Sequence, residues 1–355
     1  MLKNTPLFIK KFMENKKTII VTGGAGYIGS HTIIEILEGT DFNVVSIDNF
    51  SNSAPITFDR IEEVTGKRVE NFNIDLCDKI ALDEVMKSIS NCVGVIHFAA
   101  FKSVPESVDN PYKYYHNNIE SLLNMLEACL KNNVQHFIFS SSCSVYGNID
   151  KLPVNEETPF SIAESPYAYT KQVGETIIKD YAKKFTSLKT ISLRYFNPVG
   201  AHLSGLIGES PINPPTSLVP IITQTAIGKR EKMLVHGEDY PTRDGSCIRD
   251  YIHVSDIAKA HVIALSYLLD GKNKSINTIF NLGTGEGVSV KEAINVFEKV
   301  SGLTLNYEVG ERREGDVEAI YSDTTKSKNE LGWETEKNID EMMLSAWKWQ
   351  QNLDK

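Results

Sequence analysis

The segment Thr18–Ser30, TIIVTGGAGYIGS, constrains the fold of this chain more than any other stretch. An apolar run, Ile19–Val21, precedes a cluster of glycines, and a helical pattern follows. This order predicts a strand, a sharp turn and a helix, which together bind the pyrophosphate of a dinucleotide. Glycines let the backbone approach the phosphates, and the first helical turn offers free N–H groups and a positive dipole end. The spacing Gly23-x-x-Gly26-x-x-Gly29 differs from the commoner G-x-G-x-x-G, so this prediction needs support elsewhere in the chain.

The second predicted strand, Asn43–Asp48, ends in an acid that provides such support. Asp48 follows the glycine turn by roughly 20 residues, where a dinucleotide-binding fold holds the ribose hydroxyls of the adenosine. A carboxylate at this place repels a 2′-phosphate. The predicted cofactor is therefore NAD rather than NADP.

Strands and helical patterns alternate as far as residue 195. Further strands are predicted at Phe72–Leu76, where Asp75 could reach the adenine, at Val93–Ala100 and at His136–Ser142, with a long helix at Pro111–Asn132. Short links between alternating elements predict an α/β fold with a doubly wound parallel Rossmann sheet, which binds ligands at the carboxyl ends of its strands. We expect this NAD-binding domain to span residues 17–195.

Beyond Arg194, prolines and glycines break the alternation into shorter elements. Helices are predicted at 217–228, 255–269 and 290–300, and a strand at 279–282. This pattern fits a smaller α/β substrate domain better than a second Rossmann unit. We expect residues 196–355 to form mainly this domain, with some strands returning to the Rossmann sheet.

Composition narrows the class of protein. Of the 355 residues, 41% are hydrophobic and 23% charged, and the net charge of −9 argues against sequence-independent binding of nucleic acid. Five scattered cysteines without C-x-x-C spacing indicate reduced thiols rather than disulfides or a zinc site. No apolar run approaches the length of a membrane span, and residues 1–16 are predicted to be a flexible tail. We expect a cytoplasmic protein that binds neither membrane nor metal.

The predicted catalytic residues lie in the middle of the chain. A helix is predicted from Pro166 to about Phe185, and it places Tyr167 and Lys171 four residues apart on one face. A tyrosine hydroxyl with a pKa near 10 is a poor base, but a nearby ammonium and the positive nicotinamide ring of NAD⁺ would lower that pKa. Ser142, at the end of the fifth strand, could then hydrogen-bond the reacting hydroxyl. Tyr169 lacks a basic partner four residues on and is not chosen.

The glycine turn, Ser142 and Tyr167-x-x-x-Lys171 together resemble the extended short-chain dehydrogenase/reductase superfamily and, within it, the UDP-galactose 4-epimerase family. The resemblance runs from about Lys17 to the C-terminus. It is carried by TGGAGYIGSH (22–31), FAAFKSVPESV (98–108), YFNPVGAH (195–202), GSCIRDYIHV (245–254) and RREGD (312–316).

This resemblance implies two sets of binding residues. The cofactor residues are Gly23, Gly26, Tyr27, Ile28, Gly29, Asp48, Asn49, Asp75, Leu76, Phe98, Ala99, Lys102, Asn117 and Tyr195. The substrate residues are Asn197, Ser217, Arg249, Tyr251, Arg313, Asp316 and Ile320. Arg249 and Arg313 are chosen for the pyrophosphate because a planar guanidinium binds phosphate oxygens in pairs.

The implied reaction is a redox-neutral inversion. Tyr167, as phenolate, would remove the proton of the sugar 4-hydroxyl while C4 passes a hydride to NAD⁺, and the 4-keto sugar would take the hydride back on its other face. The implied substrates are UDP-galactose and UDP-glucose. UDP-N-acetylhexosamines, UDP-uronic acids and catalytically silent binding of NAD remain alternatives. A 4,6-dehydratase would need acids beside Ser142, where this chain has Cys143 and Ser144.

Two positions depart from the family pattern. Thr216-Ser217-Leu218 stands where relatives usually carry Asn-Asn-Leu, so we expect a changed uridine or phosphate contact. Ile320 stands where a tyrosine excludes N-acetyl sugars and a cysteine admits them. The resemblance also implies a homodimer, with helices 111–132 and 166–185 as a possible four-helix interface.

Overall fold

Strand β1 (Thr18–Thr22) lies inside the central sheet of the computed structural model, which describes residues 16–210, 212–313 and 316–353. The side chains of β1 alternate between two layers. Ile19 and Val21 belong to one hydrophobic core and Ile20 to the other, and all three are fully buried. The β-branched run is therefore apolar at every position because both faces of the sheet are covered.

Seven parallel strands form this sheet in the order β11-β6-β5-β4-β1-β2-β3. The reversal of strand order beside β1 is that of a doubly wound Rossmann sheet, which confirms the predicted fold class. The strand bounds are β1 Thr18–Thr22, β2 Asn43–Ile47, β3 Glu70–Phe72, β4 Cys92–His97, β5 His136–Ser142, β6 Lys189–Tyr195 and β11 Asn277–Leu282.

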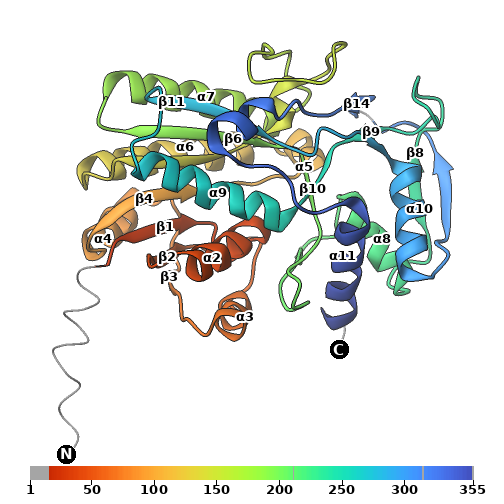
Figure 1. Cartoon of the computed structure of the whole chain (residues 1–355), viewed down its shortest axis with the longest axis horizontal. Coiled ribbons are helices and arrows are strands. Elements are labelled where there is room, and N and C mark those ends of the chain that lie inside the picture. The colour runs from red at the N-terminus through yellow and green to blue at the C-terminus, as the bar shows by residue number, and fades with distance from the viewer. Residues whose placement is uncertain (1–15, 211, 314–315, 354–355) are drawn as a thin grey trace, which may run out of the picture.

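Helices cover both faces of the sheet (Figure 1). One core contains residues of α2 (Tyr27–Gly39), α3 (Ile56–Thr65) and α9 (Val254–Leu269). The opposite core contains residues of α4 (Lys79–Ser88), α6 (Pro111–Lys131) and α7 (Pro166–Lys184). Two short helices, α5 (Val104–Asp109) and η1 (Cys143–Tyr146), follow the carboxyl ends of β4 and β5.

The third strand is shorter and earlier than predicted. It spans Glu70–Phe72 rather than Phe72–Leu76. Asp75 instead lies in the turn before α4, where its carboxylate accepts hydrogen bonds from the Cys77 N–H at 2.9 Å and the Asn49 amide at 3.3 Å. Asp75 thus stabilises a turn. The strand ends before it because a side chain that hydrogen-bonds the nearby backbone competes with strand pairing.

The remaining elements form a smaller part beside the sheet (Figure 1). Its core contains residues of three helices and of the strands β7, β8 and β10, and β13 pairs with β8 outside this core. Its helices are α8 Leu218–Ala226, α10 Val290–Ser301 and α11 Ile339–Leu353. Its strands are β7 Asn197–Val199, β8 Met233–His236, β9 Ile248–Arg249, β10 Tyr251–His253, β12 Val288–Ser289, β13 Tyr307–Gly310 and β14 Ala319–Ile320.

The chain passes repeatedly between the two parts. After β10 it returns as α9 and β11 to the seven-stranded sheet, and β11 forms the edge beside β6. After β14 it returns again as η2 (Ser327–Leu331), whose Leu331 is buried in the same core as α9. The return includes a helix as well as a strand.

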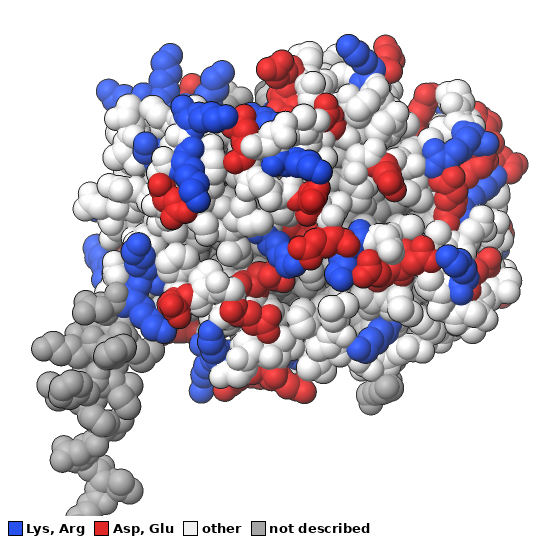
Figure 2. All heavy atoms as spheres, viewed as in Figure 1, with Lys and Arg blue, Asp and Glu red and all other residues white. Residues whose placement is uncertain are grey.

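Two further features concern the surface. The tail predicted over residues 1–16 lies outside the described residues except for Lys16. Within the described residues, no helix is long and apolar enough to span a membrane. On the face drawn in Figure 2, acidic and basic side chains are interspersed.

Candidate active site

A cavity of about 960 Å³ lies between the two parts. It is bordered by the carboxyl ends of the strands β1, β2, β4, β5 and β6 and, on the other side, by residues of the smaller part. Every predicted catalytic, cofactor and substrate residue lines this one cavity. The carboxyl edge of a doubly wound sheet is where such folds bind ligands, so the topology accounts for this convergence.

The glycine turn forms one wall. Gly23 has a left-handed φ of +69°, and a Cβ there would lie 2.9 Å from the Ala99 nitrogen. Gly26 caps α2, and no side chain hydrogen-bonds to the free N–H groups of that helix end. The positive end of α2 therefore faces the cavity at Tyr27, Ile28 and Gly29, an arrangement that fits the pyrophosphate of a dinucleotide.

Asp48 directly follows β2 and connects two loops beside the cavity. Its carboxylate accepts hydrogen bonds from the Ala25 N–H at 2.9 Å, the Phe50 N–H at 2.8 Å and the Ser53 hydroxyl at 2.9 Å. It thus ties the glycine turn to the loop after β2 while lining the cavity. Asn49, with its amide on Asp75, lines the cavity as well. The acid is both a structural anchor and a candidate contact for ribose hydroxyls.

Contacts across the cavity mouth join the two parts. Lys102 forms an ion pair with Glu209 at 2.7 Å, and the Tyr27 hydroxyl donates to the Gly200 carbonyl at 2.6 Å. The Arg60 guanidinium lies 5.0 Å from the centre of the Trp349 ring, and the Trp349 indole N–H donates to the Glu209 carbonyl at 2.9 Å.

Arg60, Glu209 and Trp349 were not predicted from the sequence, although all three line the cavity. The members of each pair are far apart in the chain, and no motif spacing connects them. A lone arginine or tryptophan in sequence is usually explained by surface or core packing. Only the tertiary structure brings these residues to the cavity.

The three predicted catalytic residues come together at the ends of β5 and α7. Ser165 caps α7 by accepting from the Ala168 N–H, so the helix begins just before Tyr167. The Lys171 amine donates to the Ser140 carbonyl at 2.7 Å and lies 5.9 Å from the centre of the Tyr167 ring. The Ser142 side chain lies close enough to Tyr167 to lower the pKa of its phenol, against the effect of burial. Tyr169, the residue not chosen, is 49% exposed, and its ring packs on Tyr115 instead.

Burial dominates the proton affinities of this group. Burial raises the pKa of Tyr167 to about 12, although Ser142 opposes the rise. Burial also lowers the pKa of Lys171 to about 8, against the attraction of Glu175. Lys171 alone, at 5.9 Å from the ring centre, does not outweigh the loss of solvent around the phenol. The expectation that Lys171 and the positive nicotinamide ring of NAD⁺ together bring the Tyr167 pKa towards neutrality stays a prediction.

The arginines predicted for the pyrophosphate face one carboxylate. Asp316 accepts from Arg249 at 3.4 Å and from Arg313 at 3.0 Å. Ser217 is the residue before α8, and its hydroxyl does not cap the helix. It is exposed and lines the cavity, so it is available to a ligand. Asp316 lies between the two arginines and balances part of their charge. Their planar guanidinium groups could bind the oxygens of a phosphate in pairs.

The other predicted substrate residues and their neighbours line the cavity next to the ends of β5 and β6. Ile320 is 4% exposed, pairs with Arg249 between β14 and β9, and packs with Phe196. Asn197 and Tyr251 lie opposite one another in the β7–β10 pair. The Tyr195 hydroxyl bonds the Ser140 hydroxyl, and burial raises the pKa of Tyr195. All of these residues line the cavity beside Tyr167.

A cluster of potential metal ligands lies elsewhere. Ligand atoms of Cys77, His116 and Glu120 lie within 4.8 Å of one another. None of these three residues lines the cavity. The spacing of histidines and acids in the sequence did not indicate this cluster because Cys77 is far from His116 in the chain. The chemistry described below does not use it.

Comparison with known proteins gives one consistent result. Residues 20–345 match the family model described as GDP-mannose 4,6 dehydratase. Over 335 residues, the chain is 46% identical to the UDP-glucose 4-epimerase of Erwinia amylovora, covering 94% of this chain and 97% of that protein. It is 44% identical to the UDP-glucose 4-epimerase of Drosophila melanogaster over 339 residues, with coverage of 94% and 96%.

Solved structures agree. UDP-glucose 4-epimerase from Bifidobacterium longum, in complex with NAD⁺ and UDP, superimposes with a TM-score of 0.90 at 43% identity. The alignment covers 95% of this chain and 98% of that one. The enzyme from Stenotrophomonas maltophila, with bound NAD and formylated UDP-arabinopyranose, gives a TM-score of 0.91 at 40% identity, with coverage of 95% and 99%.

Proposed function

This chain belongs to the UDP-glucose 4-epimerase family of the extended short-chain dehydrogenases/reductases, and we infer that it is the NAD-dependent isomerase that interconverts UDP-glucose and UDP-galactose. One observation carries the inference: Ser142, Tyr167 and Lys171 line the same cavity as an uncapped helix end and a pair of arginines. The cavity thus holds the groups needed for a dinucleotide, a nucleoside diphosphate and proton transfer at a sugar hydroxyl.

We assign Tyr167 as the group that takes the proton of the sugar 4-hydroxyl and later returns it. Ser142 lies close to Tyr167 and would orient the reacting hydroxyl. Lys171 is buried against the Ser140 carbonyl and would favour the phenolate through its charge. Because burial alone raises the pKa of Tyr167, deprotonation needs more positive charge in the cavity than Lys171 provides.

NAD, when bound, accepts a hydride from sugar C4 and gives it back. Its proposed contacts are the first turn of α2 for the pyrophosphate and Asp48, Asn49 and Asp75 for the adenosine. Lys102, Asn117 and the backbone at Ala99 and Ala100 would add further contacts that keep NAD bound. The contacts between the two parts at the cavity mouth support retention of NAD through the cycle.

The nucleotide end of the substrate is assigned to Arg249 and Arg313. A pyrophosphate would take their hydrogen bonds in place of Asp316, whose carboxylate could then turn to the uridine ribose. Ser217 would contribute a hydroxyl where relatives usually carry an amide. Firm binding of the UDP end, with Asn197, Tyr251 and Ile320 around the sugar, leaves the 4-keto sugar room to turn over.

Elimination of water is not favoured, although the matching family model is described as a dehydratase. Dehydration needs an acid and a base beside the catalytic serine, and this chain has a thiol at Cys143 and a hydroxyl at Ser144. Both residues line the cavity. The buried Ile320, intermediate in volume between cysteine and tyrosine, supports UDP-glucose and UDP-galactose as the main pair.

We further propose a cytoplasmic homodimer. Exposed aromatic side chains on α6 and α7, among them Tyr112 at 75%, Tyr115 at 36% and Tyr169 at 49%, support pairing of these helices with a second copy. We assign residues 17–195 to NAD binding and 196–355 mainly to the nucleotide sugar, with β11 in the sheet of the first part and α9 packed in the core on one face of that sheet.

The test is incubation of the purified full chain with UDP-galactose without added NAD, followed by assays for UDP-glucose and for NAD released on denaturation. Conversion together with released NAD is the expected result. Bound NAD without conversion would mean a different nucleotide sugar. If neither appears, even after NAD is added, the chain is a catalytically silent member of its family.

A further inference from the structure

Three consecutive serines at the end of β5 each interact with a residue of α7. Their partners on α7 are spaced four residues apart, which is about one helical turn. Lys171 donates to the Ser140 carbonyl, the Ser141 hydroxyl donates to Glu175, and Ser142 lies close to Tyr167. The first and third contacts involve the residues assigned to catalysis. We propose, on the basis of the proposed function, that the second contact makes Glu175, with Arg194 behind it, a positioning pair that sets the catalytic helix against the catalytic strand.

Glu175 is held rigidly. The Arg194 guanidinium grips its carboxylate with two parallel hydrogen bonds, from Nε to Oε1 at 2.9 Å and from Nη2 to Oε2 at 2.7 Å. Both side chains are only 3% exposed. A bidentate pair of this kind is strong and fixes direction as well as distance. The Ser141 hydroxyl shares Oε1 with Arg194, so one carboxylate connects α7, β5 and β6.

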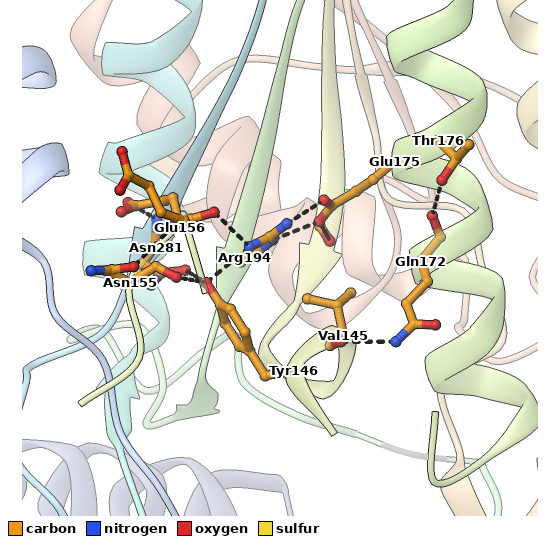
Figure 3. A network of polar contacts seen from close by, with 11 residues as sticks. Val145, Tyr146, Asn155, Glu156, Gln172, Glu175, Thr176, Arg194 and Asn281 are labelled. Atoms are coloured by element: carbon orange, nitrogen blue, oxygen red, sulfur yellow. Dashed lines mark hydrogen bonds and ion pairs between the residues drawn. The ribbon is translucent and has the colours of Figure 1, made fainter. Parts of the chain in front are cut away.

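Arg194 is fixed in turn by a polar network, drawn in Figure 3. Its Nη1 donates to the Tyr146 hydroxyl at 3.0 Å, and that hydroxyl donates to the Asn281 side chain at 2.6 Å. The Asn281 backbone N–H donates to Glu156 at 2.7 Å. The network therefore extends from α7 through β6 to β11 and to the loop after η1.

Charge gives the pair a second consequence. The titratable and charged groups around Lys171 are Tyr167 and Glu175 on its own helix and His97 at the end of β4, with Arg194 behind Glu175. Glu175 is the anion among them. Its attraction opposes the effect of burial on Lys171, so it helps to keep the amine protonated while the phenol loses its proton.

Neither Glu175 nor Arg194 lines the cavity, and Ser141 does not line it either. These residues act through Lys171 and Ser142, and a buried ion pair could equally serve only the fold. The two roles differ in their effect on the pH profile. A purely structural pair would change stability when broken, whereas a positioning pair would also change the ionisation of Lys171.

The experiment compares four variants of the full chain with the wild type. Glu175→Gln removes the negative charge but keeps the shape of the side chain. Arg194→Lys keeps the positive charge but loses the paired hydrogen bonds of the guanidinium group. Ser141→Ala removes only the hydrogen bond between Glu175 and β5. Thr176→Ala is the matched control, since this hydroxyl bonds Gln172 within α7. For each variant we would measure kcat and KM for UDP-galactose across pH, retained NAD, and the thermal midpoint.

Glu175→Gln should shift the alkaline limb of the kcat profile to lower pH by about 1 unit, because Lys171 loses its neighbouring anion. Arg194→Lys should lower the thermal midpoint and leave that limb in place. Ser141→Ala should lower kcat by roughly 10- to 100-fold with KM unchanged, since misplacement by about 1 Å can cost on the order of 10²-fold. Thr176→Ala should match the wild type.

The proposal is overturned if Glu175→Gln folds and keeps the wild-type limb, or if Ser141→Ala keeps the wild-type kcat. Should Glu175→Gln fail to fold, Ser141→Ala alone decides, because it leaves the ion pair intact. A wild-type protein that does not convert UDP-galactose contradicts the proposed function instead. Wild-type conversion with unaffected variants contradicts only the positioning role.

Discussion

The amine of Lys171 lies 5.9 Å from the centre of the Tyr167 ring, one turn further along α7. Its hydrogen bond goes to the Ser140 carbonyl, so it acts on the phenol through space. In the protein alone this attraction does not overcome burial, which raises the pKa of Tyr167 to about 12. We therefore expect that the positive charge of the oxidised cofactor, when bound, would be needed in addition to Lys171 for Tyr167 to lose its proton.

Replacing Tyr167 by phenylalanine should lower kcat by about 10²- to 10⁴-fold, the range that general acid–base groups contribute. NAD should stay bound, because the proposed cofactor contacts remain. Tyr169→Phe, two residues on along the same helix and turned towards Tyr115, is the control and should keep full activity. Equal activity of the two variants in the UDP-galactose assay would remove Tyr167 from its assigned role.

Replacing Arg249 by alanine should weaken UDP binding by roughly 10- to 100-fold, because a hydrogen bond to a charged group contributes about 1.5–3 kcal/mol. Titration calorimetry with UDP measures the effect. Arg312→Ala is the matched control, since Arg312 pairs with Asp239 and packs on Tyr240 without lining the cavity. An unchanged Kd for Arg249→Ala would place the pyrophosphate elsewhere.

Ile320→Tyr should reduce turnover of UDP-N-acetylglucosamine more than turnover of UDP-glucose. Ile320 belongs to a buried cluster with Phe196 and also lines the cavity, so we expect the larger ring to extend into the cavity. Ile320→Val, which removes one methyl group, should leave the ratio of the two kcat/KM values close to that of the parent. Similar ratios for parent and tyrosine variant would show that Ile320 does not control sugar size.

Acid should destabilise the fold through buried histidines. Burial lowers the pKa of His31 and His97 to about 3 and that of His253 and His261 to about 4. The unfolded chain then binds more protons than the folded one below pH ~6.5, so the free energy of unfolding falls as the pH falls from there towards the folded values.

Urea unfolding at pH 6.5 and pH 5 measures this loss. His261→Phe should reduce it by up to about 2 kcal/mol, since 1.5 pH units correspond to that amount for one histidine. His116→Ala is the control, because His116 is exposed and pairs with Glu120. An equal loss in the parent and in His261→Phe would contradict the assignment.

Replacing Tyr115 by arginine should weaken self-association at least about tenfold, because truncating a central interface aromatic commonly costs about 2 kcal/mol. Sedimentation velocity across a concentration series gives the dissociation constant. Tyr307→Arg, on β13 and similarly exposed at 40%, is the control. A monomeric wild type would contradict the dimer itself.

Local sequence predicted the elements whose signals are local. The fifth strand, His136–Ser142, ends where predicted because its apolar run stops in three serines. The third strand was misplaced because FNIDL is as apolar as a strand, while the Asp75 carboxylate accepts from the Cys77 N–H and turns the chain before α4. The candidate site converged because each motif ends at the same edge of the sheet.

Several contacts could not be predicted because they join residues that no sequence pattern links. The ion pair of Glu175 with Arg194 joins a helix to a strand of ordinary composition, and neither residue lies in a motif spacing that predicts the pair. The same holds for Lys102 with Glu209 and for Arg60 with Trp349, which cross from one part to the other. In each case the strength of the contact depends on how deeply the two side chains are buried and on how they are oriented.

The return of α9 and β11 to the first sheet limits how this chain can be divided into fragments. A fragment ending at residue 195 would leave β6 as a bare edge and expose the apolar surface that α9 covers. Unpaired edges of this kind recruit other chains and aggregate. A fragment with only the cofactor half is therefore expected to aggregate, and a fragment that folds on its own has to include α9 and β11.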